Sequence, residues 1–405
     1  MKRSMNTSWL YLFTWLVEFS AMLVIFTVSR SLAEAEAEPW VLGIVGGGFS
    51  LFLAASSAIS GHCSDRANRS RLMATGIALL ILCILGCRFT ESTDKVHYLF
   101  YWLSAAALGL IYPSLYARLS ASADRKGFSR GIGRTVIGFA LMWNLGIVSG
   151  LTAGGWLFKE SADWPLYGSI ILAIAALCLL RFITPTEATQ TQEDPKDLST
   201  PEVNLQTLSA AFMKLAWVAN LGSAFSMGMV FHLFPDIAVH LDVPSAQHGI
   251  IVATSRVIAI LTYFAMYHLS FWHLRLAPAL ASQMLAIVGL ILISYAQGPV
   301  ELVVGLALLS QLAGFNYFAS LFYSTAGSSH KRRAAASGFH EATLALGFAA
   351  GSILGGLAGD TGDPGTPYRL GAIVILVLAL LQTGLYRMQV RPLMQRFNKP
   401  QQAHQ

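Results

Sequence analysis

The sequence predicts an all-α integral membrane protein in which twelve transmembrane helices form two pseudo-symmetric six-helix bundles. Three observations support this fold class. The 405 residues are 55% hydrophobic and 12% charged, whereas soluble domains carry about 25% charged residues. The apolar residues gather in runs of roughly 17–25 residues, the length that crosses a bilayer. A glycine pattern in one of these runs recurs in another, half a chain later, as duplicated transporter folds show.

Twelve apolar runs are long enough to span a membrane. A segment inside lipid must satisfy its own backbone hydrogen bonds, so each run is expected to be a helix. A large soluble helical core is the alternative, but it would need polar outer faces that these runs lack. The approximate limits are 8–31, 40–60, 71–88, 97–119, 131–157, 164–184, 210–234, 248–268, 275–296, 300–325, 334–358 and 368–388.

A long polar stretch, 185–209, separates six runs from six runs. It has no apolar periodicity and is expected to be a flexible cytoplasmic linker. The expected domains are therefore an N-terminal bundle over 1–184 and a C-terminal bundle over 210–390. The basic, polar segment 391–405 is expected to be a cytoplasmic tail, disordered or lying at the lipid surface.

The basic residues indicate the topology. If the N-terminus is cytoplasmic and the runs alternate in direction, 21 of the 27 Lys and Arg fall at the cytoplasmic side. This positive-inside pattern predicts a multi-pass protein of the plasma (inner) membrane with both termini in the cytoplasm. The net charge of +6 then reflects topology rather than nucleic-acid binding. The first run resembles a secretory signal, but its length and Glu18 favour a retained span.

Two glycine ladders share the pattern G-x3-G-x3-G-G, in the fifth and eleventh runs. The first consists of Gly146, Gly150, Gly154 and Gly155, and the second of Gly347, Gly351, Gly355 and Gly356. Small residues at every fourth position let two helices approach closely. The eight glycines are therefore predicted to be helix-packing positions.

The loop after the second run carries a recognisable motif. It reads Gly61-His62-Cys63-Ser64-Asp65-Arg66-Ala67-Asn68-Arg69-Ser70-Arg71. This pattern, G-x3-D-R-x2-R-x-R, resembles the signature loop of the major facilitator superfamily. Together with the twelve runs, the linker and the ladders, the resemblance covers essentially the whole chain. It implies the major facilitator fold, with a cytoplasmic gate at Gly61, Asp65, Arg66, Arg69 and Arg71.

The chain departs from the family pattern at three places. Asn68 replaces the usual glycine, a mild change because Asn tolerates left-handed backbone. The equivalent loop of the second half, 269–275, has no acidic residue. The first ladder resembles a fifth-span motif associated with antiporters, but Leu151 stands where that motif has proline. Simple helix packing is the other interpretation of this ladder.

Four ionisable residues inside the apolar runs carry the functional argument: Glu18, Arg256, His340 and Glu341. A charge at the bilayer centre costs at least about 2.5–3.5 kcal/mol, so such residues usually face a cavity or a partner. The resemblance places the first, fourth, seventh and tenth runs around a central cavity. Glu18, on the first run, is therefore the leading candidate proton-coupling residue. His340 and Glu341, on the eleventh run, are the others, because histidine titrates near neutrality and a desolvated Glu can be raised toward it. A structural hydrogen bond for Glu18, and a gate contact of the His–Glu pair with Arg66 or Arg69, are the alternatives.

Arg256 leads the candidate solute-binding residues. It is suited to an anionic solute, but it could equally be a counter-ion to Glu18 or Glu341, or part of a structural pair. Asn144 on the fifth run is expected at a similar depth. The other candidates are Tyr112, Tyr116, Asn220, Gln311 and Asn316, together with the polar residues His232 and Tyr317. Polar residues in spans often only tie helices together.

These features predict a secondary transporter that moves a small organic solute by alternating access. No G-x4-G-K-[ST] phosphate-binding loop occurs, so the energy source is expected to be an ion gradient. Proton-coupled export by antiport is the first expectation, and proton-coupled uptake by symport, possible for an anionic solute, is the alternative. A transport-inactive receptor or scaffold is the rival class, against which the charges inside spans argue.

Neither an enzyme nor a metal or cofactor site is expected, because no His/Asp/Glu cluster has ligand spacing. The expected partners are a small-molecule solute, protons or another coupling ion, and the lipid bilayer. No nucleic-acid partner is expected, and the expected state is a monomer.

Overall fold

The computed structural model describes residues 2–64, 68–123, 128–183, 200–328 and 333–398, and these residues contain helices and no strand. The first half contains α1 (Lys2–Glu34), α2 (Pro39–Ser64), α3 (Arg69–Arg88), α4 (Lys95–Ala123), α5 (Phe128–Glu160) and α6 (Asp163–Leu179). The second half contains α7 (Thr200–His232), the short α8 (Phe234–His240), α9 (Ser245–His268), α10 (Ala277–Ser294), α11 (Pro299–Ala326), α12 (Arg333–Gly359), α13 (Thr366–Leu385) and α14 (Arg391–Asn398). Twelve helices are long and apolar enough to cross a membrane, which confirms the predicted fold class.

Two segments expected to be irregular are helical. Helix α7 begins at Thr200, well inside the expected linker 185–209. Its Thr-Pro-Glu start suits a helix N-terminus, because Pro fits the first turn, where its missing N–H is not needed. Helix α14 continues α13 through a π-helical turn, so 391–398 is not a disordered tail. Leu393 and Met394 of α14 pack against buried residues of the second half, which stabilises this extension.

The two halves repeat the same helix contacts. In the first half α1 packs on α5 and α6, and α4 packs on α2 and α3. In the second half α7 packs on α12 and α13, and α11 packs on α9 and α10. The two most extensive contacts between the halves are also equivalent: α5 lies against α9, and α12 lies against α2. The duplication read from the glycine ladders is therefore present in three dimensions.

The glycine ladders supply both kinds of contact. A Cβ at Gly146 would lie 2.6 Å from the Cβ of Glu18 on α1, and one at Gly347 would lie 2.7 Å from the carbonyl oxygen of Leu221 on α7. These are contacts within one half. The last glycine of each ladder touches the other half instead. Gly155 lies against Ser245 and Gly249 on α9, and Gly356 lies against Gly43 on α2.

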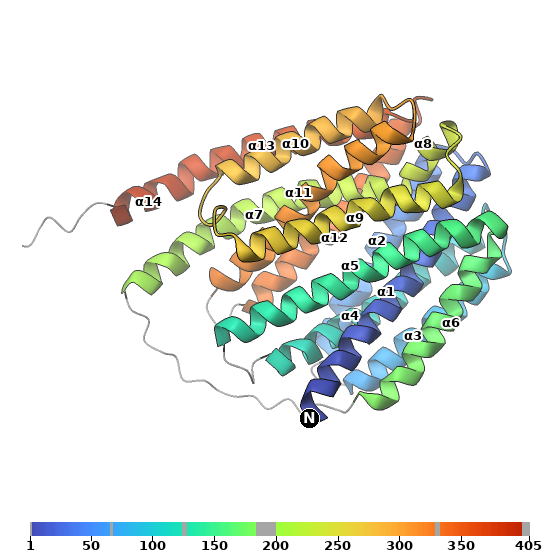
Figure 1. Cartoon of the computed structure of the whole chain (residues 1–405), viewed down its shortest axis with the longest axis horizontal. Helices are drawn as coiled ribbons and strands as arrows, with labels where there is room; N and C mark the ends of the chain where they lie inside the picture. Colours follow the sequence, from blue (N-terminus) through green and yellow to red (C-terminus); the bar gives the residue numbers. More distant parts are fainter. Residues whose placement is uncertain (1, 65–67, 124–127, 184–199, 329–332, 399–405) are drawn as a thin grey trace, which may run out of the picture.

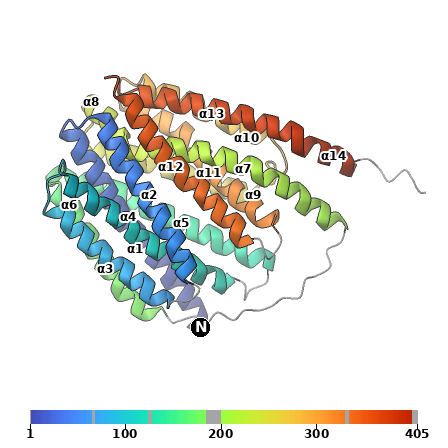
Figure 2. The ribbon, with the colours of Figure 1, turned by 180° about the vertical axis from the view of Figure 1, so that it is seen from behind.

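The halves meet closely at only one end of the molecule. We call it the sealed end; there α1 is followed by α2, and α8 lies between α7 and α9. At the opposite end, the linker end, α6 is followed by the linker and α7 begins. The helices of the two halves diverge toward the linker end in both views (Figures 1 and 2).

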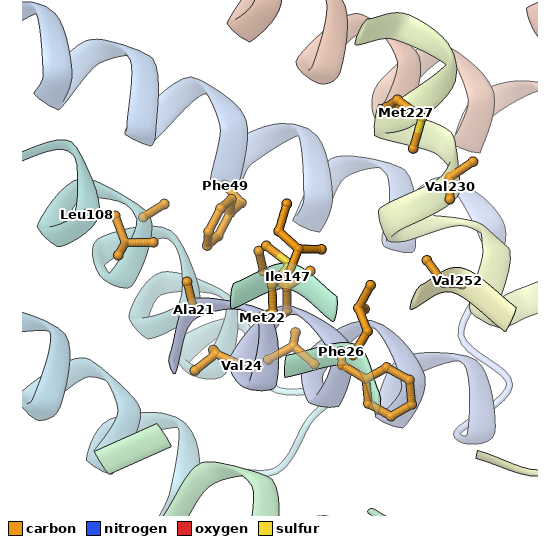
Figure 3. Packing of buried hydrophobic residues seen from close by; sticks show 14 of the residues in the cluster. Ala21, Met22, Val24, Phe26, Phe49, Leu108, Ile147, Met227, Val230 and Val252 are labelled. Carbon is orange, nitrogen blue, oxygen red and sulfur yellow. The ribbon is translucent and has the colours of Figure 1, made fainter. Parts of the chain in front are cut away.

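One apolar core joins the two halves near the sealed end. Figure 3 shows Met22 and Phe26 of α1 and Ile147 of α5 close to Val230 of α7 and Val252 of α9. Toward the linker end the second half has a separate core around Phe212, Trp272 and Tyr323. Most side chains of α2 from 51 to 59 and of α12 from 338 to 346 are exposed or partly exposed there. The burial pattern therefore describes bundles that share a core at the sealed end and separate toward the linker end.

Candidate functional site

Glu18 lies on α1, the most buried of the twelve spans, and only 2% of it is exposed. The Tyr112 hydroxyl of α4 donates a hydrogen bond to its carboxylate, and the Trp143 side chain of α5 also hydrogen-bonds it. Gly146 leaves room for the Glu18 side chain on the facing side of α5. Three helices of the first half thus hold one carboxyl group beside the boundary with the second half.

Arg256 on α9 approaches this carboxyl group from the second half. It is 5% exposed, and its guanidinium lies 4.6 Å from the centre of the Phe231 ring. Its Nε and Nη2 atoms are buried without a hydrogen-bond partner. Glu18 lies within electrostatic range of Arg256. No direct ion pair within 4 Å joins them among the contacts of the described residues.

An aromatic layer crosses between the halves next to this pair. Tyr317 of α11 lies with its ring centre 6.1 Å from Trp143 and 6.0 Å from Tyr263 of α9. Its hydroxyl interacts with that of Tyr116 on α4. The side chain of Asn144 hydrogen-bonds Tyr263, while its Oδ1 atom has no partner. The layer lies on the linker-end side of Glu18, because these rings sit closer to the linker ends of their helices.

His340 and Glu341 of α12 point in different directions. His340 is fully buried and its Nδ1 lies 2.7 Å from the Ser320 hydroxyl of α11. Glu341 is 47% exposed, and its Oε1 lies 3.8 Å from His340 Nε2. Glu341 also lies within electrostatic range of Tyr116 and Tyr317. It therefore stands beside the aromatic layer, closer to the linker end than Glu18.

The remaining candidate solute-binding residues do not join the cluster. Asn220 donates a hydrogen bond to Thr343, and Asn316 donates one to the carbonyl of Ala219. Asn316 also lines a small cavity inside the second half, together with Trp272 and Gln382. The side chain of Gln311 bonds to Ser282 on α10 and to the carbonyl of Leu308. These three amides tie helices of the second half together.

The signature loop is only partly within the described residues. Gly61 lies in the last turn of α2, while Asp65 and Arg66 lie outside the described ranges. Arg69 and Arg71 open α3, where Asn68 is the N-cap and accepts bonds from the N–H groups of Ser70 and Arg71. Asn68 has φ −68°, so its helix cap, and not a left-handed backbone, explains why Asn fits there.

Sequence reasoning missed two aromatic side chains of the site, Trp143 beside Glu18 and Phe231 beside Arg256. An aromatic residue in an apolar run is as hydrophobic as its neighbours, so no sequence pattern could have selected Trp143 or Phe231. It also missed Arg118 of α4, a buried arginine that hydrogen-bonds the Ser70 hydroxyl at the linker end. Its charge near the end of a long apolar run was the available signal.

Comparison with known proteins identifies the family to which this arrangement of helices belongs. A model of the Major Facilitator Superfamily matches residues 7–330. No curated protein matches the sequence. The structure resembles that of the nucleoside transporter NupG, with a TM-score of 0.67 and 17% identity over 94% of this chain and 99% of that one.

Two further solved structures share the fold. A bacterial homologue of the human lysosomal transporter Spinster, in an inward-facing and unoccupied conformation, has a TM-score of 0.65 and 15% identity, over 97% of this chain and 98% of that one. The human organic anion transporter MFSD10 has a TM-score of 0.64 and 14% identity, over 94% and 99%. The family match covers most of the chain, and the chain belongs to the Major Facilitator Superfamily.

Proposed function

We propose that the protein is a secondary transporter that moves a small organic anion together with a proton by alternating access. One observation carries the proposal. Arg256 presents unpartnered donors inside the protein, and Glu18 faces it from the other half without a direct ion pair. A buried guanidinium stays charged and loses several kcal/mol of hydration, so it requires an anion nearby. Glu18 is the resident candidate, and a solute carboxylate is the other.

The coupling follows from electrostatics. An ionised Glu18 balances the charge of Arg256 and repels an incoming anion, because both negative charges would share a region of low dielectric constant. A proton on Glu18 removes that repulsion and leaves Arg256 free for the solute. The solute and the proton then bind together. After both leave, Glu18 and Arg256 balance each other again, and the empty protein can reset.

Antiport is the second candidate, and the sequence favoured it. An exported cation would compete with the proton for Glu18. Arg256 argues against this version, because a fixed positive charge within electrostatic range disfavours a second cation there. The named relatives include transporters of nucleosides and organic anions. At 17% and 14% identity, these two structures support the transporter fold alone. The proposal that the solute is an anion comes from Arg256.

We also propose that the linker end faces the cytoplasm of a plasma (inner) membrane, with both termini inside and the protein a monomer. The distribution of Lys and Arg supports this orientation. The structure would then be closed on the outside. The proposed domains are the two six-helix halves, joined by the segment before Thr200.

Transport in proteoliposomes tests the proposal. Wild type and Glu18→Gln would be compared with a panel of small carboxylates, with and without an imposed inward proton gradient. We expect the gradient to accelerate wild-type uptake and to leave Glu18→Gln unchanged, while the variant still exchanges labelled for unlabelled solute. Glu160→Gln, an exposed residue at the end of α5, is the matched control and should behave as wild type.

Three results would contradict the proposal. Gradient-driven uptake by Glu18→Gln equal to wild type would remove Glu18 from coupling. Protons moving against the solute would establish antiport. No gradient-dependent flux for any solute in the panel would favour the scaffold.

A further inference from the structure

We infer that the transported solute is a flat aromatic monoanion, held by Arg256 and stacked between Trp143 and Tyr317. This inference rests on the proposed function and adds the solute's chemical class. The charge of the solute follows from Arg256, whose Nε and Nη2 atoms are buried and unpartnered. A guanidinium presents paired donors in one plane, and a carboxylate is the group that matches this geometry best.

The aromatic part of the solute follows from the rings around Arg256. Phe231 stacks on its guanidinium at 4.6 Å, and Trp143 and Tyr317 face each other from opposite halves. Toward the sealed end the halves also meet, through glycines and through the apolar core that contains Met22 and Val252. Large rings from both halves therefore lie beside the unpartnered donors of Arg256, which Tyr263 links to Tyr317.

The spacing of Trp143 and Tyr317 suits a thin solute. Their ring centres are 6.1 Å apart, with an angle of 31° between the planes. A flat ring between two others needs about 7–8 Å, twice the contact distance of carbon atoms. A separation of the halves by about 1–2 Å would therefore admit a planar ring. A saturated ring is thicker and needs a wider opening.

The rings are also held in place by hydrogen bonds. Tyr317 interacts with Tyr116, Tyr263 is held by Asn144, and Trp143 is bonded to Glu18. A site whose walls are fixed in advance loses less entropy when it binds its ligand. The bond between Trp143 and Glu18 also links the stacking wall to the proposed proton site.

Three matched probes test the inference: benzoate, cyclohexanecarboxylate and benzamide. Affinities would be measured by isothermal titration calorimetry on the full-length protein in nanodiscs, at mildly acidic pH. Stacking on aromatic rings is worth about 0.5–1.5 kcal/mol, so benzoate should bind roughly 3–10-fold more tightly than cyclohexanecarboxylate. Benzamide lacks the charge and should bind at least about 30-fold more weakly than benzoate.

Two pairs of variants separate stacking from other losses. Trp143→Phe and Trp143→Leu both lose the hydrogen bond to Glu18, but only the leucine variant loses the ring. We expect Trp143→Phe to keep the preference for benzoate and Trp143→Leu to abolish it. Tyr317→Phe and Tyr317→Leu should differ in the same way. Trp164→Leu, at an exposed tryptophan of α6, should bind all probes as wild type does.

The results distinguish this inference from the proposed function. Equal affinity for benzoate and cyclohexanecarboxylate, or no binding of benzoate, would overturn the aromatic class. Equal affinity for benzamide and benzoate would overturn the anion. Proton-driven uptake of an aliphatic carboxylate would then leave the proposed function standing. Gradient-driven uptake by Glu18→Gln would instead remove the proposed coupling, whichever probe binds.

Discussion

Single residues show two ways of placing a charge in this fold. Arg30 of α1 is largely satisfied, because it bonds to Glu34 and to the carbonyl of Val243 across the sealed end, and only its Nη1 atom has no partner. Among the described residues, Arg256 has the ring of Phe231 against it, with Tyr263 and the Glu18 carboxylate in electrostatic range. The first arrangement stabilises one conformation. The second leaves a group that gains from a ligand, since an unmade hydrogen bond of a buried donor costs about 1–3 kcal/mol.

A carboxyl group at the sealed end gives a test of stability against pH. Asp236 lies in α8, outside the spans, and burial raises its pKa, while His240 partly offsets this. Because the pKa of Asp236 is higher in the folded state than in the unfolded state, its ionisation destabilises the fold. This penalty is absent at low pH and grows as pH rises through the interval between the two pKa values. We expect Asp236→Asn to melt at a higher temperature than wild type at pH 8.

The same comparison at pH 4 should show a smaller difference, because the penalty of Asp236 falls as its carboxyl group takes up a proton in the folded state. Thermal melting of the detergent-solubilised protein, followed by tryptophan fluorescence, measures this difference in melting temperature. Asp242→Asn is the control, because Asp242 is exposed or partly exposed and Asn tolerates its φ of 52°. It should shift the melting temperature by about 1 °C or less. A constant difference at both pH values would show that Asp236 carries no such penalty.

The sequence indicated the charged site residues and the tyrosines, but not the tryptophan and phenylalanine beside them. Glu18 and Arg256 stand out because a charge contrasts with an apolar run. Trp143 and Phe231 do not contrast with it. Gln311 and Asn316 were selected for polarity, but their side chains bond within the second half. Polarity alone does not say which face of a helix a residue occupies.

At the scale of elements, the helices followed from the sequence and their ends did not. Apolar runs long enough to cross a bilayer have one regular structure available, which is why all twelve were predictable. The starts of α7 and α14 depend on local capping and packing. The loop 269–275 differs from its counterpart in the first half. Where the first half has a charged motif, this loop buries Trp272, whose Nε1 donates to the carbonyl of Met266.

The contact of α1 with α5 predicts a strong effect at Gly146. A valine side chain there would enter the space of Glu18, since even a Cβ would lie 2.6 Å from its Cβ. Overpacking costs typically about 1–3 kcal/mol and would displace the carboxyl group. We expect Gly146→Val to reduce proton-driven uptake by about tenfold or more while the protein still inserts and folds.

Gly384→Val on α13 is the control for Gly146→Val. A Cβ added at Gly384 meets nothing within 4 Å, so uptake should stay near the wild-type rate. Proteoliposome uptake and size-exclusion profiles of both variants measure the difference. Normal uptake by Gly146→Val would show that α1 can move away from α5 without affecting Glu18.

At the scale of the whole molecule, the close contacts of the sealed end predict a way to hold it open. Gly43 touches Gly356, and Gly249 touches Gly155, each pair joining the two halves. Tryptophan at Gly43 and Gly249 cannot fit there. We expect the double variant to lose uptake, because the sealed end can no longer close.

A buried reporter at the sealed end measures that opening. Met22→Cys, placed where the residue is 5% exposed, would be treated with a membrane-impermeant maleimide in a background without native cysteines. Its labelling should rise by about tenfold in the double tryptophan variant, as a shift of population would require. The reporter alone is the control. Unchanged labelling would mean that the sealed end closes despite the added side chains.

The two glycine contacts at the sealed end also define a fulcrum. A line through the Gly155–Gly249 and Gly43–Gly356 contacts crosses the boundary between the halves, and the halves diverge away from it. Helices that cross a bilayer are about 30 Å long, and Glu18 stands near the middle of one. If the halves pivot about this line, the gap between Glu18 and Arg256 changes by roughly half of any movement at the linker end, because Glu18 lies about half-way between the two ends. A swing of a few ångströms there would therefore supply the additional separation of about 1–2 Å that a planar ring needs between Trp143 and Tyr317.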